Sequence, residues 1–292
     1  MRPFLFTIGT MKVPSFFFFI MIATLACTFY LYLNARKRGI QPEAMLDIGI
    51  IGMLAGVIGA RIFHILVEAP DYYWEKPMRV FEFWRGGFVS WGGFLAILFS
   101  LTAYFKIRKL SALVYFDYFA TGAAIIKFFV RVACVLTGCC YGKPTDVPWA
   151  ITYTNPDSTA YYYYPNIALH PSQVYSMVHA ILLFFFVHWY YNRTHPRVSG
   201  GRSPSEANDE ARCKTDVGRG ARAVSRPGQT ICVLAMGWSL PRAFIETFRG
   251  DADRGVYFGG LLSTGQITGG LIFLTALAIF LYLRKRKTFQ PA

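Results

Sequence analysis

Long apolar stretches alternate with short polar or basic stretches along almost the whole chain. Seven of them reach the length of about 20 residues that an α-helix needs to cross the hydrocarbon core of a membrane. They lie near residues 13–34, 45–67, 87–107, 111–137, 170–191, 229–248 and 264–283. The pattern predicts an all-α, polytopic membrane protein with about seven transmembrane helices, folded as a single domain over residues 1–292.

One segment, 193–229, breaks this pattern. It has no apolar periodicity and is rich in glycine, serine, arginine and proline, so it predicts a flexible basic loop. The composition of the rest supports the membrane assignment. With 54% hydrophobic and only 16% charged residues, the chain is too apolar for an ordinary soluble domain.

The charges of the connecting segments predict the orientation in the membrane. Eighteen of the 30 lysines and arginines follow the first, third, fifth and seventh apolar stretches, and eight lie on the other side. Because basic loops stay in the cytoplasm, the N-terminus is expected outside and the C-terminus inside. The net charge of +14 is thereby explained as a topology signal, and no nucleic-acid partner is expected.

Several ionisable residues fall within the predicted spans, where a charge is costly and usually faces an interior cavity. They are Asp47, Arg61, Asp117, Lys127, Arg131, Arg242 and Glu246. Lys127 and Arg131 share a helix face, and Arg242 can pair with Glu246 four residues later. The excess of cations indicates a phosphate site, because arginine binds phosphate oxygens through two parallel hydrogen bonds. In a structural alternative, Arg131 pairs with Asp117 or a helix end.

Two glycine-rich segments, "RGGFVSWGG" at 85–93 and "GCCYGKP" at 138–144, lie on the outer side beside these cations. Glycine permits tight turns and the close approach of a ligand, so a lipid head group is the expected ligand. The six cysteines form neither a disulfide framework nor a metal-ligand spacing, and no metal or cofactor is expected. Cys139 and Cys140 are either small buried thiols or include a catalytic thiol.

Six segments resemble the prolipoprotein diacylglyceryl transferases of the bacterial inner membrane. In chain order they are "GARIFH", "GGFVSWGG", "RVACVLTGCCYGKPTDVPW", "LHPSQVY", "PRAFIETFRGD" and "STGQI". The resemblance implies transfer of the diacylglyceryl group from phosphatidylglycerol to the lipobox cysteine of a prolipoprotein, without a cofactor. Its partners would be phosphatidylglycerol, prolipoprotein signal peptides and membrane lipids, and its N-terminus would be periplasmic.

The resemblance also implies roles for individual residues. Arg131 and Arg242 would stabilise charge on the departing phosphate, and Glu246 would be their acidic partner. If a base is needed, His170 and Glu246 are the candidates, although His170 can equally orient the start of a helix. The positions expected to bind substrate are Arg61, Lys127, Gly92, Gly93, Gly138, Tyr141 and Gly142.

The chain departs from the family pattern at several positions. Trp91 stands where the family usually has histidine, and Phe16 where it has tyrosine. Cys134 and Cys139 replace the frequent asparagine and glutamate. Two other functions therefore stay open. One is a noncatalytic paralogue that binds an anionic lipid or a lipoprotein precursor, and the other is a transporter, since intramembrane charges also mark transport pathways.

Overall fold

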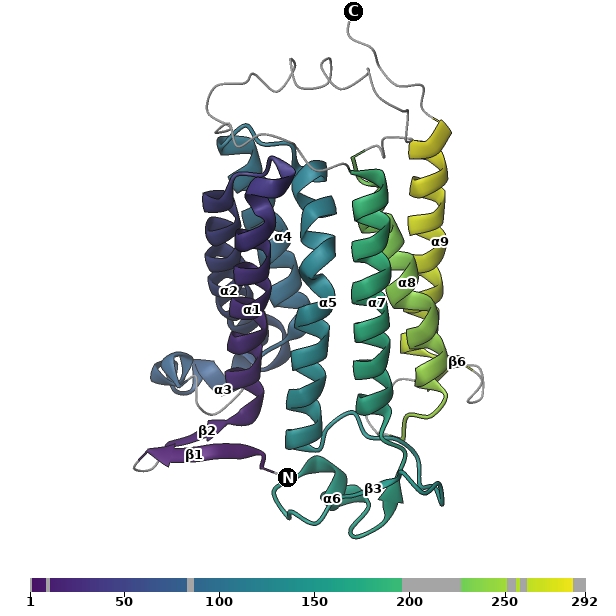
Figure 1. Cartoon of the computed structure of the whole chain (residues 1–292). Coiled ribbons are helices and arrows are strands. Elements are labelled where there is room, and N and C mark those ends of the chain that lie inside the picture. The colour runs from purple at the N-terminus through teal and green to yellow at the C-terminus, as the bar shows by residue number, and fades with distance from the viewer. Residues whose placement is uncertain are drawn as a thin grey trace, which may run out of the picture.

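The computed structural model describes residues 2–8, 11–82, 87–195, 227–250, 256–257 and 262–285. A long helix stands at each of the seven predicted positions, so the mainly helical fold is confirmed (Figure 1). These helices are α1 (Ser15–Ala35), α2 (Pro42–Phe63), α4 (Ser90–Ile107), α5 (Ala112–Thr137), α7 (Ser172–Thr194), α8 (Gln229–Glu246) and α9 (Thr264–Lys285).

Five helices in the described part of the chain are long and apolar enough to cross a membrane. The spans are Ser15–Arg38, Pro42–Glu68, Ala112–Thr137, Ser172–Thr194 and Thr264–Lys285. α4 contains a shorter apolar helix, Trp91–Ile107, and α8 carries Arg242 and Glu246 among its 18 residues. The chain is a multi-pass membrane protein.

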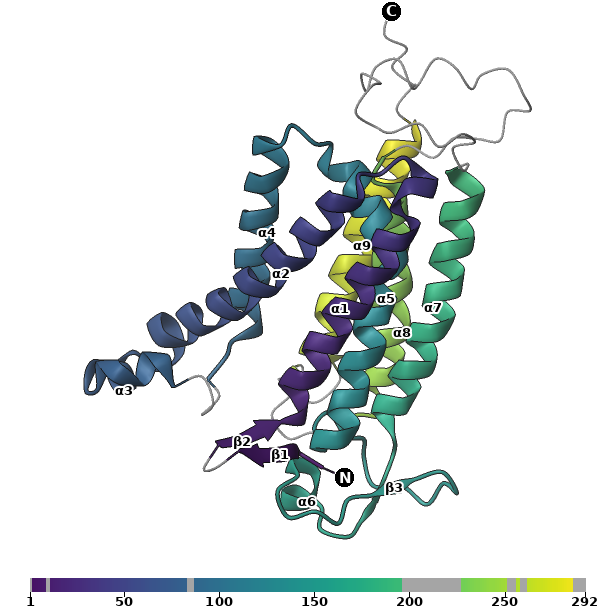
Figure 2. The same cartoon turned by 60° about the vertical axis from the view of Figure 1, so that its left-hand side comes forward.

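The helices pack mainly in neighbouring pairs. α1 lies against α5, α5 against α7, α8 against α9, and α2 against α4. Figure 2 shows α2 and α4 set apart from the other long helices, with α2 slanting outward. The contact between α2 and α4 depends on glycine, since a Cβ on Gly92 would lie 2.6 Å from the carbonyl oxygen of Gly59. Such small residues let helix backbones approach closely within a membrane.

The largest apolar core lies between α1, α2, α4 and α5. It includes Cys27, Leu31, Met45, Leu101, Phe105 and Tyr115. Many other large apolar side chains on the long helices are exposed, among them Phe29, Leu54 and Phe99. An outward apolar surface of this kind matches a lipid environment, where a helix satisfies its own backbone polar groups.

Short elements that the hydrophobic pattern did not predict gather at one end of the bundle (Figure 1). We call this the hairpin end, after the antiparallel hairpin of β1 (Phe4–Ile8) and β2 (Met11–Pro14). The others are η2 (His64–Glu68), α3 (Pro70–Trp74), η3 (Pro77–Phe81), β3 (Ile151–Thr152) paired with β4 (Ala168–Leu169), α6 (Thr159–Tyr163), and β5 (Val256–Tyr257) paired with β6 (Leu262–Ser263). The opposite end carries η1 (Arg36–Arg38).

The predicted flexible loop lies largely outside the described residues, which omit 196–226. Where its start is described, α7 continues as a helix to Thr194. The flexibility of the loop therefore stays a prediction.

Candidate active site at the hairpin end

The loop after α5 begins with a helix cap that requires glycine. Gly138 has φ of 71°, in the left-handed region. Its N–H and that of Cys139 donate to the carbonyl oxygen of Cys134 at 2.9 and 3.2 Å, and the second bond is the long bond of a Schellman motif. A Cβ at Gly138 would also lie 2.7 Å from the Cβ of Ser158. Gly138 therefore ends α5 and turns the chain, and its predicted role in substrate binding stays a prediction.

The start of α7 holds this loop in place. Gln173 donates from Nε2 to the carbonyl oxygen of Cys139 at 2.8 Å, and Ser172 donates from Oγ to that of Cys140 at 2.6 Å. The Gly142 N–H donates to the carbonyl oxygen of His170 at 3.0 Å. The segment "HPSQ" therefore fixes the backbone of the loop that follows α5.

A second chain segment joins the loop from the other side. Gly142 forms a β-bridge with Arg249, and the Lys143 N–H donates to the carbonyl oxygen of Phe248 at 2.8 Å. A Cβ at Gly142 would lie 2.9 Å from that same Phe248 oxygen. Glycine at 142 thus lets the residues after α8 pack directly on the loop, which brings Arg249 to the site.

A small cavity lies where these segments meet α5, α7 and α8. Its volume is about 10 Å³, and its lining is Arg131, Cys140, Ser172, Ser176, Arg242, Ile245, Glu246 and Arg249. We call it the arginine cavity. It brings together Arg131, Arg242 and Glu246. Among the residues that the structure describes, neither Arg131 nor Arg242 has a hydrogen bond or an ion pair.

Sequence spacing allowed Arg242 to pair with Glu246, but between these two described residues the structure has no hydrogen bond or ion pair. Glu246 accepts a hydrogen bond from Nη1 of Arg249 at 3.4 Å instead. The chain turns at the end of α8, where the Arg249 N–H donates to the carbonyl oxygen of Glu246, and this turn carries the guanidinium back toward the carboxylate. The first turn of α9 covers the same group, because a Cβ on Gly265 would lie 2.8 Å from Cδ of Glu246.

Lys127 lies one helical turn before Arg131 and has partners of its own. Its Nζ is 2.7 Å from Nδ1 of His179 and 4.3 Å from the centre of the Trp238 ring. His179 places Nε2 at 2.9 Å from the carbonyl oxygen of Gly237, so Nε2 carries the proton and Nδ1 accepts from Lys127. Lys127 therefore joins α5, α7 and α8 through neutral groups and does not line the arginine cavity.

Two further predicted residues lie at the hairpin end, Tyr141 in the loop after α5 and His170 just before α7. His170 has Nδ1 at 3.2 Å from the Tyr175 hydroxyl, and its ring packs against Phe248 with centroids 5.2 Å apart. Tyr141 is 1% exposed and packs edge to face on Tyr164. Neither residue lines the arginine cavity.

Arg61 lies in a different place. It is 4% exposed and donates to the carbonyl oxygens of Arg79 and Gly87 at 2.8 and 3.1 Å. It also lines a separate cavity of about 300 Å³ between α2 and the segment that leads to α4. Gly92 and Gly93, at the start of α4, pack on α2. The structure gives these three residues packing or backbone contacts, and their role in substrate binding stays a prediction.

Asp117 does not pair with Arg131, contrary to the structural alternative. Its carboxylate accepts from the N–H groups of Gly228 and Ile231 at 2.7 and 2.8 Å and so caps the start of α8. This contact is at the end opposite the hairpin end. Arg131 follows on the same helix at about 1.5 Å per residue, or about 21 Å away.

Five lining residues of the cavity were not among the predicted site residues: Cys140, Ser172, Ser176, Ile245 and Arg249. Arg249 and Ile245 stand inside the segment "PRAFIETFRGD" and Ser172 inside "LHPSQVY", both of which carried the family resemblance, and Cys140 was considered as a possible catalytic thiol. Cys140 has φ of 55°, unusual for a residue with a side chain. Hydrogen bonds from the thiols of Cys134 and Cys139, followed by the charges of Arg131 and Arg249, lower the pKa of Cys140.

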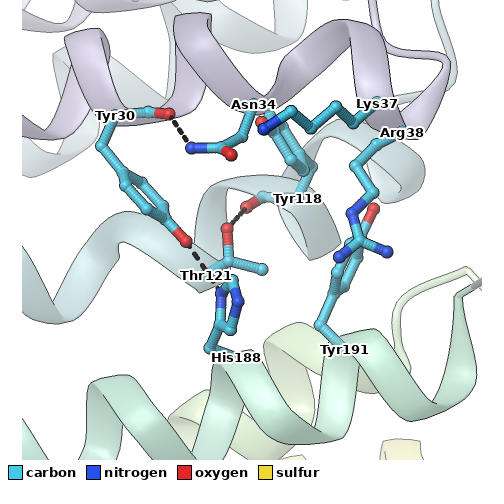
Figure 3. A pocket seen from close by; sticks show the side chains of 8 residues that line it. All are labelled: Tyr30, Asn34, Lys37, Arg38, Tyr118, Thr121, His188 and Tyr191. Atoms are coloured by element: carbon cyan, nitrogen blue, oxygen red, sulfur yellow. Dashed lines mark hydrogen bonds between the residues drawn. The ribbon is translucent and has the colours of Figure 1, made fainter. Parts of the chain in front are cut away.

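A second polar cavity, of about 60 Å³, lies at the opposite end of the bundle (Figure 3). We call it the Arg38 pocket; its lining is Tyr30, Asn34, Lys37, Arg38, Tyr118, Thr121, His188 and Tyr191. Arg38 donates from Nη1 to the carbonyl oxygen of His195 at 2.8 Å and from Nη2 to Oδ1 of Asn192. Tyr30 places its hydroxyl 2.8 Å from Nδ1 of His188. The hydrophobic pattern gave no sign of this pocket.

Comparison with known proteins gives a consistent result. The family model described as "Prolipoprotein diacylglyceryl transferase" matches residues 3–203. The phosphatidylglycerol–prolipoprotein diacylglyceryl transferase of Clostridium tetani is 26% identical over 287 residues, which cover 98% of this chain and 100% of that protein. The enzyme of the same name numbered 2 in Clostridium perfringens is 26% identical, over 97% of this chain and 94% of its own length. That of Nitrosomonas europaea is 28% identical, over 83% and 77%.

Proposed function

The chain belongs to the prolipoprotein diacylglyceryl transferase family, and from this we propose that it transfers the diacylglyceryl group of phosphatidylglycerol to the lipobox cysteine of a prolipoprotein. In this reaction the cysteine sulfur forms a bond to the glyceryl carbon, and the bond from that carbon to the phosphate oxygen breaks. Glycerol phosphate leaves with the bonding electrons. The thiol proton passes to a base.

The site assignment rests on two arginines whose guanidinium groups have no hydrogen-bonding protein partner among the described residues. Arg131 and Arg242 line one cavity, and neither has a hydrogen bond or an ion pair within the described ranges. A charge inside a membrane span is costly unless a partner offsets it. A lipid phosphate is a suitable partner, because its oxygens accept the two parallel hydrogen bonds that a guanidinium offers.

The same arrangement suits the chemistry of the departing group. Negative charge grows on the phosphate oxygen as the carbon–oxygen bond breaks, and arginines placed beforehand stabilise it without reorganising. Three arginines and one carboxylate line the cavity, so its field favours an anion. At about 10 Å³ the cavity holds about one water, and we propose that the phosphate enters as the surrounding side chains move apart.

Glu246 is the proton acceptor that we propose. It lines the arginine cavity, it is held by Arg249, and it is 4% exposed. His170, the other candidate base, lies just before α7, beside Tyr175 and Phe248. A noncatalytic paralogue would use the same arginines to hold phosphatidylglycerol and would leave it unchanged.

The test is turnover by purified protein in vesicles that contain phosphatidylglycerol, with a lipobox peptide as acceptor. The peptide should gain the mass of a diacylglyceryl group while glycerol phosphate is released in equal amount. Bound phosphatidylglycerol with neither product would favour the noncatalytic paralogue. Flux of a solute across the vesicle membrane, without a lipidated peptide, would favour the transporter.

The residue that sharpens this test is Arg131. Arg131→Lys keeps the charge but cannot form two parallel hydrogen bonds, so we expect turnover to fall about 100-fold with an unchanged melting temperature. Arg193→Lys is the matched control, because Arg193 is exposed at the opposite end and lies over Trp189. Near-normal turnover by Arg131→Lys would contradict the proposal that Arg131 binds the lipid phosphate through two parallel hydrogen bonds.

We also propose the full topology, with seven membrane crossings and a periplasmic N-terminus in the bacterial inner membrane. Supporting it, α4 and α8 run alongside the five candidate spans (Figure 1). Reporter fusions after Arg38 and Lys109 should report the cytoplasm, and fusions at Pro77 and Thr154 the periplasm. A reversed result at one of these sites would change the number of crossings.

A further inference from the structure

Three cysteine thiols meet at the hairpin end, beside the arginine cavity. The Sγ atoms of Cys134, Cys139 and Cys140 all lie within 4.8 Å of one another. Cys134 belongs to the last turn of α5, and the left-handed Gly138 turns the chain so that the next two residues return over it. The grouping therefore comes from the folding of the loop, which is why the spacing of the cysteines did not indicate a metal site.

The backbone that carries these thiols is held by buried polar side chains. Ser172 donates to the carbonyl oxygen of Cys140 at 2.6 Å, and Gln173 donates to that of Cys139 and to the Tyr153 hydroxyl, both at 2.8 Å. Gln173 is 0% exposed and Ser172 is 2% exposed. Such outer contacts fix the orientation of metal ligands in known sites, and here they fix the loop before any ligand binds.

The distances suit a thiolate-bound metal ion. Zinc binds cysteine sulfur at about 2.3 Å in a tetrahedron, which places the sulfur atoms about 3.8 Å apart. Sulfur atoms that already lie within 4.8 Å of one another need to move by about 1 Å or less. The adjoining arginine cavity has room for about one water as a fourth ligand, and Cys140 lines it.

The charges around the cluster suit thiolates as well. Arg131, Arg242 and Arg249 line the cavity that Cys140 borders, and Glu246 is the carboxylate among the lining residues. Nearby cations favour the deprotonated form of cysteine, which is the form that binds metal. Three thiolates with one Zn²⁺ carry a single negative charge, which these arginines offset.

We propose that Cys134, Cys139 and Cys140 bind one zinc ion, with water from the arginine cavity as its fourth ligand. Binding releases three thiol protons and forms three sulfur–zinc bonds, and no oxidation state changes. Nothing in the family name or in the relatives' names assigns a metal to this chain. The zinc site adjoins the arginine cavity of the proposed transfer reaction, but its test is independent of that reaction, because it measures the metal and not turnover.

The test uses the full-length protein in detergent, reduced and stripped with a chelator, with Co²⁺ as the probe. Two variants divide the six cysteines between them. In one, the three thiols outside the cluster are removed by the substitutions Cys27→Ala, Cys213→Ala and Cys232→Ala. In the other, the cluster itself is removed by the substitutions Cys134→Ala, Cys139→Ala and Cys140→Ala.

Wild type and the variant that keeps the cluster should each bind one Co²⁺ per chain. Both should show a sulfur-to-cobalt charge-transfer band and intense tetrahedral d–d bands, and one equivalent of Zn²⁺ should remove these bands. The variant without the cluster should show neither. If that variant fails to fold, wild type and the first variant still decide, since the proposal requires equal spectra from them.

Three results would overturn the proposal. The first is that wild type binds no Co²⁺ through sulfur, and the second is that the bands persist in the variant without the cluster. The third is that thiol titration of the reduced protein finds a disulfide within the cluster. Each is read directly from the spectrum or from the thiol count, whatever the transferase activity of the sample.

Discussion

The arginine cavity and the Arg38 pocket place the same kind of group, a guanidinium, at opposite ends of one bundle. In the Arg38 pocket, Arg38 donates to His195 and Asn192. Its guanidinium also lies 5.3 Å from the centre of the Tyr191 ring, which Figure 3 draws beside it. In the arginine cavity, Arg131 and Arg242 have no hydrogen bond to any residue within the described ranges. Both sites contain partly buried arginines, and the hydrogen bonds of those arginines are what distinguishes them.

The difference has a physical reason. A partly buried charge must recover the hydrogen bonds that it loses when it leaves water. Arg38 recovers them from fixed acceptors at the end of α7, so it ties α7 to η1 and contributes to stability. Arg131 and Arg242 have no hydrogen-bond acceptor among the described residues, and Glu246 in the same cavity offsets their mutual repulsion only in part. We therefore expect them to contribute little to stability and to be available to an anionic ligand. Accordingly, we expect the Arg38 pocket to be structural, and we propose the arginine cavity as the site for chemistry.

The largest expected effect comes from exchanging one arginine at each end for glutamine. Arg242→Gln should lower kcat/KM at least about 100-fold, or about 2.7 kcal/mol, because one of the phosphate partners is lost. Its melting temperature should change little, since the repulsion by Arg131 and the attraction to Glu246 are removed together. Arg38→Gln should leave turnover per folded molecule unchanged and lower the melting temperature. Steady-state kinetics and detergent melts of both proteins provide the two measurements.

The distinction between the two sites would be wrong if Arg242→Gln lost stability and Arg38→Gln lost turnover. A large loss of stability in Arg242→Gln would make that arginine structural. A large loss of turnover in Arg38→Gln, at unchanged folded fraction, would extend the functional site to the opposite end.

The long helices could be predicted from the sequence because a membrane imposes a local rule. Each span must be apolar over about 20 residues and must satisfy its own backbone hydrogen bonds, so its signal lies within one stretch of chain. The short elements at the hairpin end obey no such rule. β3 and β4 have two residues each and exist because Ile151 and Leu169 meet across the fold.

For the candidate site, too, the sequence predicted what depends on local segments and missed the contacts made across the fold. Segment resemblance brought Arg131, Arg242 and Glu246 together, but helical spacing offered only Arg242 as a partner for Glu246. The turn after α8 places Arg249 there instead. Lys127 likewise finds His179, 52 residues later in the sequence, and no local pattern reports such a partner.

A second pair of variants, on α9, sharpens the account of the arginine cavity. A Cβ on Gly265 would lie within 3.0 Å of the Glu246 carboxylate atoms, whereas a Cβ on Gly270 would have nothing within 4 Å. Gly265→Ala should therefore displace Glu246 and lower kcat about 10-fold, or about 1.4 kcal/mol. Gly270→Ala, on the same helix, should leave kcat unchanged and raise helix stability slightly. Equal kinetics for the two variants would show that the position of Glu246 does not matter.

The smallest expected effect concerns the acid sensitivity of the Arg38 pocket. His195 follows α7, and its ring stacks on Tyr191 with centroids 4.2 Å apart. Burial and then the charge of Arg38 lower the pKa of His195 from 6.5 to about 4. Between these pH values the unfolded chain binds a proton that the folded protein excludes. The stability that depends on neutral His195 is therefore complete above about pH 6.5 and declines as the pH falls toward about 4.

We expect the loss to be about 1 kcal/mol, after allowance for solvent screening at this end of the bundle. His195→Gln, which stays neutral, is the comparison that isolates it, because every other titrating group is shared by the two proteins. The measurement is the melting temperature of each protein in detergent between about pH 7 and about pH 4.5. The wild type should lose more on acidification than the variant. Parallel curves would mean that His195 is solvated well enough to accept a proton in the folded protein, and that the Arg38 pocket is more open to water than its contacts imply.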